Sequence, residues 1–422
     1  MVAELPVIEG PSSEGRSSEG RSAAGEAARA GRYGTVLGPR ELAPSALPAA
    51  RGTLSDYLVR QLAGPVRPLS GWPAPDDDAL AGEDGALALY CLYELHYRGF
   101  AGVDDRWEWE PTLLALRAEL EDDLETRLRR LASEVGEAGA HERDGRDARD
   151  GYDARDGYDA RAGRDALNVP DGRDGRDARD GVGPVAGDRV GPADVPGVLR
   201  EIIGCSTGPS LSGYLAEEGS LAQFREFAVH RSLLQLKEAD PHSWAIPRLS
   251  GRPKAALMEI QADEYGNGRA PDVHQNLFGV TMLALGLDPG YGRYLDRIPA
   301  TTLATVNLPT FFGLHRRLRA ALVGHLAVFE MTSVEPMGAY AAALRRHGLG
   351  AGARHFFEVH VVADAHHQNV AAEELARGLA LAEPALADDI LFGARAIMAV
   401  EGRCSTAILD AWRAGRSSLR SS

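Results

Sequence analysis

The 422-residue chain has few cysteines, no long apolar run and no excess of basic residues. Its three cysteines, Cys91, Cys205 and Cys404, lie far apart and none belongs to a Cys-x-x-Cys spacing, so neither a disulfide framework nor a cysteine zinc site is expected. The apolar runs are short and interrupted by charge, so no membrane span is expected. The N-terminus lacks a basic segment followed by an apolar one, so no secretion signal is expected and the predicted location is the cytoplasm.

Basic residues are also scarce relative to acidic ones. Lys and Arg number 46 against 61 Asp and Glu, which gives a formal net charge of −15 at pH 7. Because polyanions repel a chain this acidic, neither nucleic acid nor an anionic membrane surface is expected as a partner. Hydrophobic residues make up 44% of the chain, which is enough for a packed globular core.

Two stretches of low complexity divide the chain. Ser-Ser-Glu-Gly-Arg occurs twice in succession within a predicted disordered tail, residues 1–50. Ala-Arg-Asp-Gly-Tyr-Asp occurs twice within a predicted disordered insert rich in Asp, Gly and Arg, residues 138–196. Such segments cannot bury enough apolar surface to offset the entropy lost on ordering. Residues 51–137 are predicted to form the N-terminal helices of the main domain, and residues 197–422 its core.

Apolar residues outside these stretches recur with the 3.6-residue period of helices, and we find no convincing strand alternation. Breaks between the periodic segments fall at Gly, Pro and Asp clusters such as Asp240-Pro241 and Gly266-Asn267-Gly268. The sequence therefore predicts an all-α bundle or helical array. The predicted helices cover residues 53–62, 78–97, 111–135, 195–203, 221–239, 253–265, 272–286, 290–297, 309–330, 335–348, 351–376, 384–400 and 402–413.

One predicted helix carries a stripe of metal-ligating residue types. His360, Asp364 and His367 stand at positions i, i+4 and i+7, so their side chains project from one helix face. Two imidazoles and a carboxylate on one face suit a transition metal. A polar helix face that happens to hold histidines is the alternative, and this stripe alone does not decide between the two.

Candidate partners for the stripe come from other predicted helices. Glu238 continues an apolar stripe that includes Phe224 and Phe227, where a carboxylate is costly unless it is paired or metal-bound. Taken alone, the simpler interpretation of Glu238 is a solvated helix end. Glu264 ends one helix and His274 lies at the start of the next, so the glycine-rich turn between them can bring both side chains to one point.

Together these residues form a candidate set of three carboxylates and three imidazoles: Glu238, Glu264, His274, His360, Asp364 and His367. This set suits two iron or manganese ions better than one structural zinc, which prefers four mostly sulfur ligands. The chain has one Asp-x-x-His, but we find no Glu-x-x-His, which disfavours the ferritin-like di-iron scaffold.

Other polar residues near these helices are assigned different roles. His366 points about 100° away from His367 on a helix, so it is expected on the surface or behind the ligands. His325 and Glu330 are five residues apart, which is a poor match for one helix face. For Glu330, a structural role is favoured over contact with a substrate in a cavity.

The spacing of the six residues resembles that of the haem-oxygenase-like di-iron oxidases and oxygenases. In this chain the pattern is a Glu, a carboxylate about 26 positions on, a His ten positions after that, and then His-x3-Asp-x2-His. The segments 237–242 and 259–266 are similar to the bacterial iron-containing redox enzymes. The resemblance covers about residues 198–418 and leaves the tail and the insert outside.

The resemblance implies a haem-oxygenase-like bundle of about seven core helices, with extra N-terminal helices, that binds iron rather than haem. All six residues would be metal ligands, holding two Fe(II) ions per chain, with manganese as the alternative metal and Glu264 as the bridging carboxylate. Members of this superfamily N-hydroxylate amines or guanidines, or cleave or desaturate amino acids and fatty acids. The implied function is an O2-dependent oxidase or oxygenase of specialised metabolism, acting on an amino acid, an amine or a fatty acid.

The implied partners are O2 and a small-molecule substrate, with an external electron donor and a homodimer as further candidates. Two alternatives of the same fold stay open: a haem-binding or haem-degrading protein, and a non-catalytic helical protein. Haem needs one proximal imidazole and a wide apolar cleft, which six converging ligands would crowd.

Overall fold

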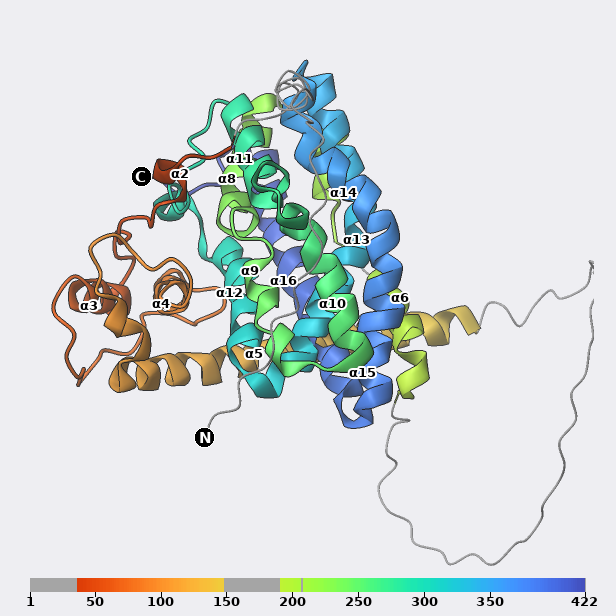
Figure 1. The fold of residues 1–422 in the computed structure, drawn as a ribbon, viewed down its shortest axis with the longest axis horizontal. Coiled ribbons are helices and arrows are strands. Elements are labelled where there is room, and N and C mark those ends of the chain that lie inside the picture. The colour runs from red at the N-terminus through yellow and green to blue at the C-terminus, as the bar shows by residue number, and fades with distance from the viewer. Residues whose placement is uncertain (1–35, 148–189, 206–207, 422) are drawn as a thin grey trace, which may run out of the picture.

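The computed structural model of the protein describes residues 36–147, 190–205 and 208–421. Within these ranges the chain is helical and forms no β-sheet, which confirms the predicted all-α class (Figure 1). None of the described helices combines the length and the apolar character needed to cross a membrane.

The helices are joined mostly by short turns, and a π-helical segment at Val370–Ala376 connects two of them directly. The helices span Pro39–Leu42 (α2), Thr53–Leu62 (α3), Glu83–Glu94 (α4), Pro111–Asp147 (α5), Val195–Gly204 (α6), Leu211–Glu217 (α7), Leu221–Gln235 (α8), Asp240–Ser243 (α9), Gly251–Glu264 (α10), His274–Ala284 (α11), Ala300–Leu314 (α12), Arg319–Arg346 (α13), Ala351–Asn369 (α14), Arg377–Ala382 (α15) and Ala387–Arg413 (α16).

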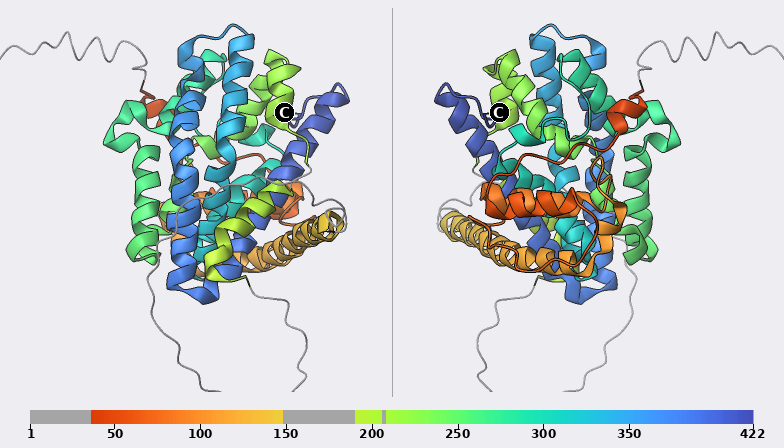
Figure 2. Two further views of the ribbon diagram at one scale, coloured as in Figure 1. Left: turned by 90° about the vertical axis from the view of Figure 1, so that its right-hand side faces the viewer. Right: turned by 90° about the vertical axis from the view of Figure 1, so that its left-hand side faces the viewer.

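Helix α13 lies at the centre of the bundle. It packs along α14 and along α16, and it also contacts α7 and the π-helical segment. Helix α11 packs against α14, and α10 packs against the π-helical segment. Helix α5 lies crosswise to α13 and α14 at one end of the bundle (Figure 2). Residues from α10, α11, α13 and α14 can therefore meet inside the bundle.

Two glycines allow α13 and α16 to cross closely. A Cβ atom at Gly324 would overlap the carbonyl group of Ile390, and a Cβ atom at Gly393 would overlap the carbonyl group of Ala321. Because each glycine faces the backbone of the other helix, the two helices approach more closely than larger residues would permit. This contact fixes the position of α13 within the bundle.

Buried apolar side chains form two clusters. The larger one joins the N-terminal helices to α12, α13 and α16. The smaller one is rich in aromatic rings, and the rings of Phe278 and Phe356 meet edge to face with centroids 5.1 Å apart. A fully buried phenylalanine contributes roughly 1.5–3 kcal/mol relative to an exposed one, so this aromatic cluster holds α8, α11, α13 and α14 together.

The predicted tail is too long, because residues 36–50 pack against the main domain. The side chain of Leu37 is buried, and its backbone N–H donates to Oδ1 of Asn276 over 2.7 Å. The carbonyl group of Glu41 accepts a hydrogen bond from the backbone N–H of Tyr291. The prediction missed these contacts because they join segments far apart in the sequence. Residues 1–35 of the predicted tail lie outside the described residues.

The predicted insert is also shorter than 138–196. Helix α5 continues to Asp147, and the alanines and glutamates at its end are good helix formers. Helix α6 begins at Val195 with Pro196 in its first turn. Backbone N–H groups in the first turn have no partner within the helix, so the missing N–H of proline costs no hydrogen bond there. Residues 148–189 of the insert lie outside the described residues.

Several helix boundaries differ from the predicted ones. Helix α12 starts at Ala300 rather than at 309, and only Leu295–Arg297 of the predicted helix 290–297 forms a short 3₁₀ turn. Helix α13 continues through Pro336, and α16 joins the two helices predicted at 384–400 and 402–413. In both long helices packing along the bundle outweighs the local preference for a break.

Candidate metal centre

Helix α14 presents His360, Asp364 and His367 on one buried face, as their spacing predicts. The three residues are 2%, 2% and 1% exposed, respectively. His366 points outward, is largely exposed and lies 2.8 Å from Oε1 of Glu259. The alternative of a solvated polar face is therefore wrong for the stripe and right only for His366.

A glycine-rich turn joins Glu264, the last residue of α10, to His274, the first residue of α11. Gly266, Asn267 and Gly268 all adopt positive φ angles in this turn. A Cβ atom at Gly266 would lie 2.5 Å from the backbone carbon of Asp272, so only glycine fits there. The turn brings Nδ1 of His274 to 3.0 Å from Oε2 of Glu264.

Glu238 lies in the turn between α8 and α9, and its side chain faces inward rather than toward solvent. The carbonyl group of the next residue, Ala239, accepts a hydrogen bond from Nε2 of Gln261 over 3.0 Å. The preceding residue, Lys237, is buried with its Nζ 3.1 Å from Oε2 of Glu94. These contacts anchor the turn on both sides of Glu238, which is 6% exposed.

Two groups of ligating residues result. In the first, one ligating atom from each of Glu238, Glu264, His274 and His360 lies within 4.8 Å of every other. In the second, Glu330, Asp364 and His367 meet the same criterion. The six residues predicted from the sequence thus divide between two neighbouring groups, and Glu330 from α13 joins the second.

The sequence interpretation of Glu330 did not anticipate this position. Its Oε2 lies 3.6 Å from Nδ1 of His367, at the same separation as Oδ1 of Asp364. A carboxylate within the apolar run around Phe329 was the available signal, since a buried acid needs a partner. The spacing from His325 was no guide, because His325 instead pairs with His242 over 3.1 Å.

Most inward-facing ligating atoms have no hydrogen-bond partner among the described residues. They are both carboxylate oxygens of Glu238, Oε2 of Glu264, Nδ1 of His274, Nε2 of His360, Oδ1 of Asp364 and Nδ1 of His367, and they meet one another only in ion-pair contacts such as the one between His274 and Glu264. Such buried polar atoms are costly and are normally satisfied. Their convergence on two points fits metal ions, which would satisfy carboxylate oxygens and imidazole nitrogens together.

Hydrogen bonds behind the ligands orient two of the imidazoles. The carbonyl group of Phe356 accepts a hydrogen bond from Nδ1 of His360 over 2.7 Å, which leaves Nε2 facing the first group. A carboxylate oxygen of Asp263 lies 3.0 Å from Nε2 of His367, which leaves Nδ1 facing the second group. Ser333 donates to Oδ2 of Asp364 over 2.5 Å. Partners of this kind are typical of metal sites, where they set the tautomer and orientation of each ligand.

The crowding of acids and imidazoles shifts their pKa values. Burial, reinforced by the charges of Asp364 and Glu264, raises the pKa of Glu330 to about 8. Burial also raises the pKa of Glu238, with Glu264 adding to the effect. Burial disfavours the charged form of His360, but Glu238 and the other carboxylates outweigh it and raise the pKa of His360 to about 10. The site therefore attracts positive charge.

Glu264 belongs to the first group and is also influenced by the charge of the second. Burial would raise its pKa, but His274, His360 and His367 outweigh burial and lower it to about 2. The first two of these imidazoles belong to the first group, and His367 belongs to the second. The charge of Glu264 is therefore stabilised by imidazoles of both groups.

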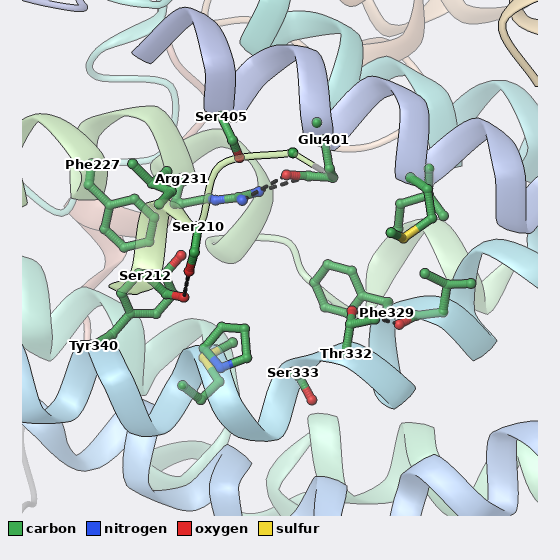
Figure 3. A pocket seen from close by; sticks show the side chains of 18 of the residues that line it. Ser210, Ser212, Phe227, Arg231, Phe329, Thr332, Ser333, Tyr340, Glu401 and Ser405 are labelled. Atoms are coloured by element: carbon green, nitrogen blue, oxygen red, sulfur yellow. Dashed lines mark hydrogen bonds and ion pairs between the residues drawn. The ribbon is translucent and has the colours of Figure 1, made fainter. Parts of the chain in front are cut away.

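Aromatic rings and two cavities surround the groups. The ring of Phe356 lies 4.4 Å from that of His360, measured between centroids. A cavity of about 300 Å³ reaches Ser333, whose hydroxyl bonds Asp364 (Figure 3). A second cavity, of about 710 Å³, is lined by His274 and Asp263. Small molecules can therefore approach the groups from two sides.

The fold and this ligand set define an all-helical protein with a buried site suited to metal ions. Residues 225–402 match the model of a family described as iron-containing redox enzyme. This match confirms the family resemblance predicted from the sequence, and the fold is of the haem-oxygenase-like class. The matched segment contains all seven residues of the two groups. No curated protein matches the chain.

Proposed function

We propose that the protein is a non-haem di-iron oxidase or oxygenase that uses O2 to oxidise a small molecule. The family match supports an iron-dependent redox function. The observation that carries the finer proposal is the pair of buried ligand groups, most of whose inward atoms have no hydrogen-bond partner in the described part of the chain.

Charge supports two divalent ions rather than one. The two groups contain the carboxylates of Glu238, Glu264, Glu330 and Asp364, which carry four negative charges when ionised. Two Fe(II) ions would balance these charges with every imidazole neutral, whereas with one ion the remaining charge would have to be balanced by protons on Glu330, Glu238 or an imidazole. Carboxylates also stabilise the ferric state, while neutral imidazoles retain ferrous iron.

The ligand assignment follows the two groups. Glu238, His274 and His360 would hold one iron, Asp364, His367 and Glu330 the other, and Glu264 would bridge them. Relative to the set predicted from the sequence, this assignment adds Glu330. Manganese remains the alternative metal.

Haem is the weaker candidate. The imidazole rings of His274 and His360 lie 4.3 Å apart between centroids, and both face carboxylates. A haem needs an imidazole nitrogen that faces an open apolar cleft, whereas Nδ1 of His274 and Nε2 of His360 face the carboxylates of Glu264 and Glu238.

The residues around the two groups exclude water and orient the imidazoles. Iron would supply the electrons and the open coordination positions needed for O2 reduction. Phe278, Phe356 and Phe357 exclude water from one side. The Phe356 carbonyl group and the Asp263 carboxylate hold His360 and His367 in the orientations that a metal needs.

Anaerobic Fe(II) loading, followed by mixing with O2 and a panel of amino acids, amines and fatty acids, tests the proposal. We expect O2 consumption that one substrate class accelerates. His360→Ala and Glu264→Ala should abolish it, because each removes a ligand. His366→Ala is the matched control, since His366 lies on the same helix but points outward, and it should retain activity.

Two results would contradict the proposal. One is iron binding and O2 consumption that survive unchanged in His360→Ala and Glu264→Ala, which would show that the two ligand groups are not the iron site. The other is a Soret band in the purified protein, which would favour haem.

A further inference from the structure

The cavity of about 300 Å³ beside the second ligand group has an apolar body. It lies among α8, α13 and α16, and the start of α7 closes one side. Phe227, Phe278, Phe357, Met337 and Tyr340 contribute to its wall. Its volume is at the lower end of the range of small-molecule sites, so it suits a compact ligand with an apolar portion.

One wall of this cavity touches the proposed metal centre. Ser333 lines the cavity, and its hydroxyl group donates to Oδ2 of Asp364. Phe357 also lines it and contacts Phe356, whose carbonyl group accepts the hydrogen bond from His360. One end of a ligand in the cavity would therefore be separated from the proposed metal ligand Asp364 only by the side chain of Ser333.

The opposite wall carries an ion pair. Nη1 and Nη2 of Arg231 donate to the two carboxylate oxygens of Glu401 over 2.9 and 2.8 Å. In Figure 3 these side chains lie across the cavity from Ser333. Both line the cavity and are mostly buried, with 19% and 25% of their side chains exposed.

A third polar residue completes this wall. Gln235 lies one turn beyond Arg231 on α8, so the two residues share a helix face. Gln235 lines the same cavity and is 5% exposed, and its Oε1 has no hydrogen-bond partner among the described residues. An unpaired buried acceptor of this kind calls for a donor.

Stability alone does not explain an ion pair at this position. A buried or half-buried ion pair often stabilises a fold no better than apolar side chains of similar volume. A guanidinium group has five N–H donors, and the pair with Glu401 occupies only two of them. Arg231 can therefore bind a ligand carboxylate without releasing Glu401.

The ligand head group must satisfy both kinds of partner. Arg231 offers donors, whereas Glu401 and Gln235 offer acceptors. A fatty acid would use the remaining donors of Arg231 but leave Oε1 of Gln235 without a donor, and a simple amine would serve Gln235 and Glu401 but leave the remaining donors of Arg231 unused. An α-amino acid carries both groups on neighbouring atoms.

We propose that this cavity binds an amino acid with an apolar side chain, its carboxylate at Arg231 and its ammonium group at Glu401 and Gln235. The side chain then extends past the aromatic wall toward Ser333 and the metal centre. Oxidation of this ligand rests on the proposed di-iron function, but its binding at the head-group site does not require metal.

Isothermal titration calorimetry on the metal-free full-length protein tests the proposal. The probes are L-leucine, L-methionine and L-phenylalanine, with 3-phenylpropanoate and 2-phenylethylamine as phenylalanine analogues that lack one head group, and octanoate as a fatty acid. We expect at least one amino acid to bind. Each analogue should bind about tenfold or more weakly than phenylalanine if phenylalanine is the best ligand, because a hydrogen bond to a charged group is lost.

Variants distinguish a loss of the head-group site from a general loss of the fold. The charge-neutral double variant Arg231→Met/Glu401→Leu should weaken amino-acid binding by about tenfold or more. Arg127→Met/Asp123→Leu removes a comparable ion pair on α5, where Nε of Arg127 lies 2.8 Å from Oδ2 of Asp123, and should leave binding unchanged. Gln235→Leu leaves the ion pair intact and should also weaken binding. This single variant tests the head-group site even if the double variant does not fold.

Three results would overturn the proposal: no probe amino acid binds, octanoate or 3-phenylpropanoate binds as tightly as the best amino acid, or folded variants bind as the wild type does. Failure of the di-iron function is a separate outcome. Amino-acid binding that depends on Arg231, in a protein that binds no iron, would uphold this inference and refute the proposed function.

Discussion

Replacing Lys237 with methionine should lower the free energy of unfolding by about 3–5 kcal/mol, because it strands a buried charge. Lys237 precedes the proposed ligand Glu238, and its side chain is 2% exposed. Its Nζ lies 3.1 Å from Oε2 of Glu94, whose side chain has no exposed surface. Nζ also lies 4.2 Å from the ring centroid of Tyr97. Without the ammonium group, the carboxylate of Glu94 keeps its hydrogen bond from the hydroxyl of Tyr291 but loses its only ion-pair partner among the residues that the structure describes.

Urea unfolding of the metal-free protein, followed by circular dichroism, measures this cost. Arg60→Met is the matched control, because Arg60 and Asp56 form an exposed ion pair over 2.9 Å. Its cost should stay below about 1 kcal/mol. The double variant Lys237→Met/Glu94→Gln should recover most of the loss, since glutamine carries no charge yet can still accept from Tyr291. If Lys237→Met costs no more than Arg60→Met, or if the double variant is no more stable than the single one, the reasoning is refuted.

Two further predictions concern the fold around the site. Burial lowers the pKa of His230 to about 3, whereas an unfolded histidine titrates near 6.5, so its contribution to stability is lost as the pH falls below about 6.5. His230→Gln should therefore reduce the stability lost between pH 6.5 and 5 by about 2 kcal/mol in urea unfolding, and equal losses would contradict this. Gly393→Ala should destabilise the protein by about 1–3 kcal/mol, because the new Cβ meets the Ala321 carbonyl group. Gly402→Ala on the same helix meets nothing within 4 Å and should stabilise by about 0.5–1 kcal/mol, so equal melting temperatures for the two variants would rule out the close helix crossing.

The parts of the site that the sequence predicted are those set by local geometry. The positions of His360, Asp364 and His367 on one face follow from helical periodicity alone. The approach of Glu264 to His274 follows from one short turn, whose glycines adopt the positive φ angles it requires. In both cases the residues are close in sequence, so few conformations are available between them.

The remaining parts depend on packing between distant segments. Glu330 reaches the second group only because α13 packs along α14, and no local pattern in the sequence specifies that contact. The burial of Glu238 similarly depends on Lys237 meeting Glu94 and on Gln261 meeting Ala239. The ion pair between Arg231 and Glu401 joins residues 170 positions apart, so no local pattern in the sequence predicts it either.

The fold shows the same division. The all-α class and the span of α3 followed from periodicity and capping, and the structure confirms both. The order of residues 36–50 did not follow, because Leu37 is held by Asn276 on α11 rather than by its neighbours in sequence. Helices α13 and α16 extend through predicted breaks because long-range packing outweighs a single Pro or Gly.

The number of iron atoms bound per chain tests the central claim most directly. The protein is loaded with Fe(II) without oxygen, freed of excess metal by gel filtration and analysed for iron and protein. We predict two irons per chain in the wild type and in His366→Ala, and fewer than two in Glu330→Ala, which removes one carboxylate from the second group. At most one iron per wild-type chain, or two in Glu330→Ala, would contradict the two-group assignment.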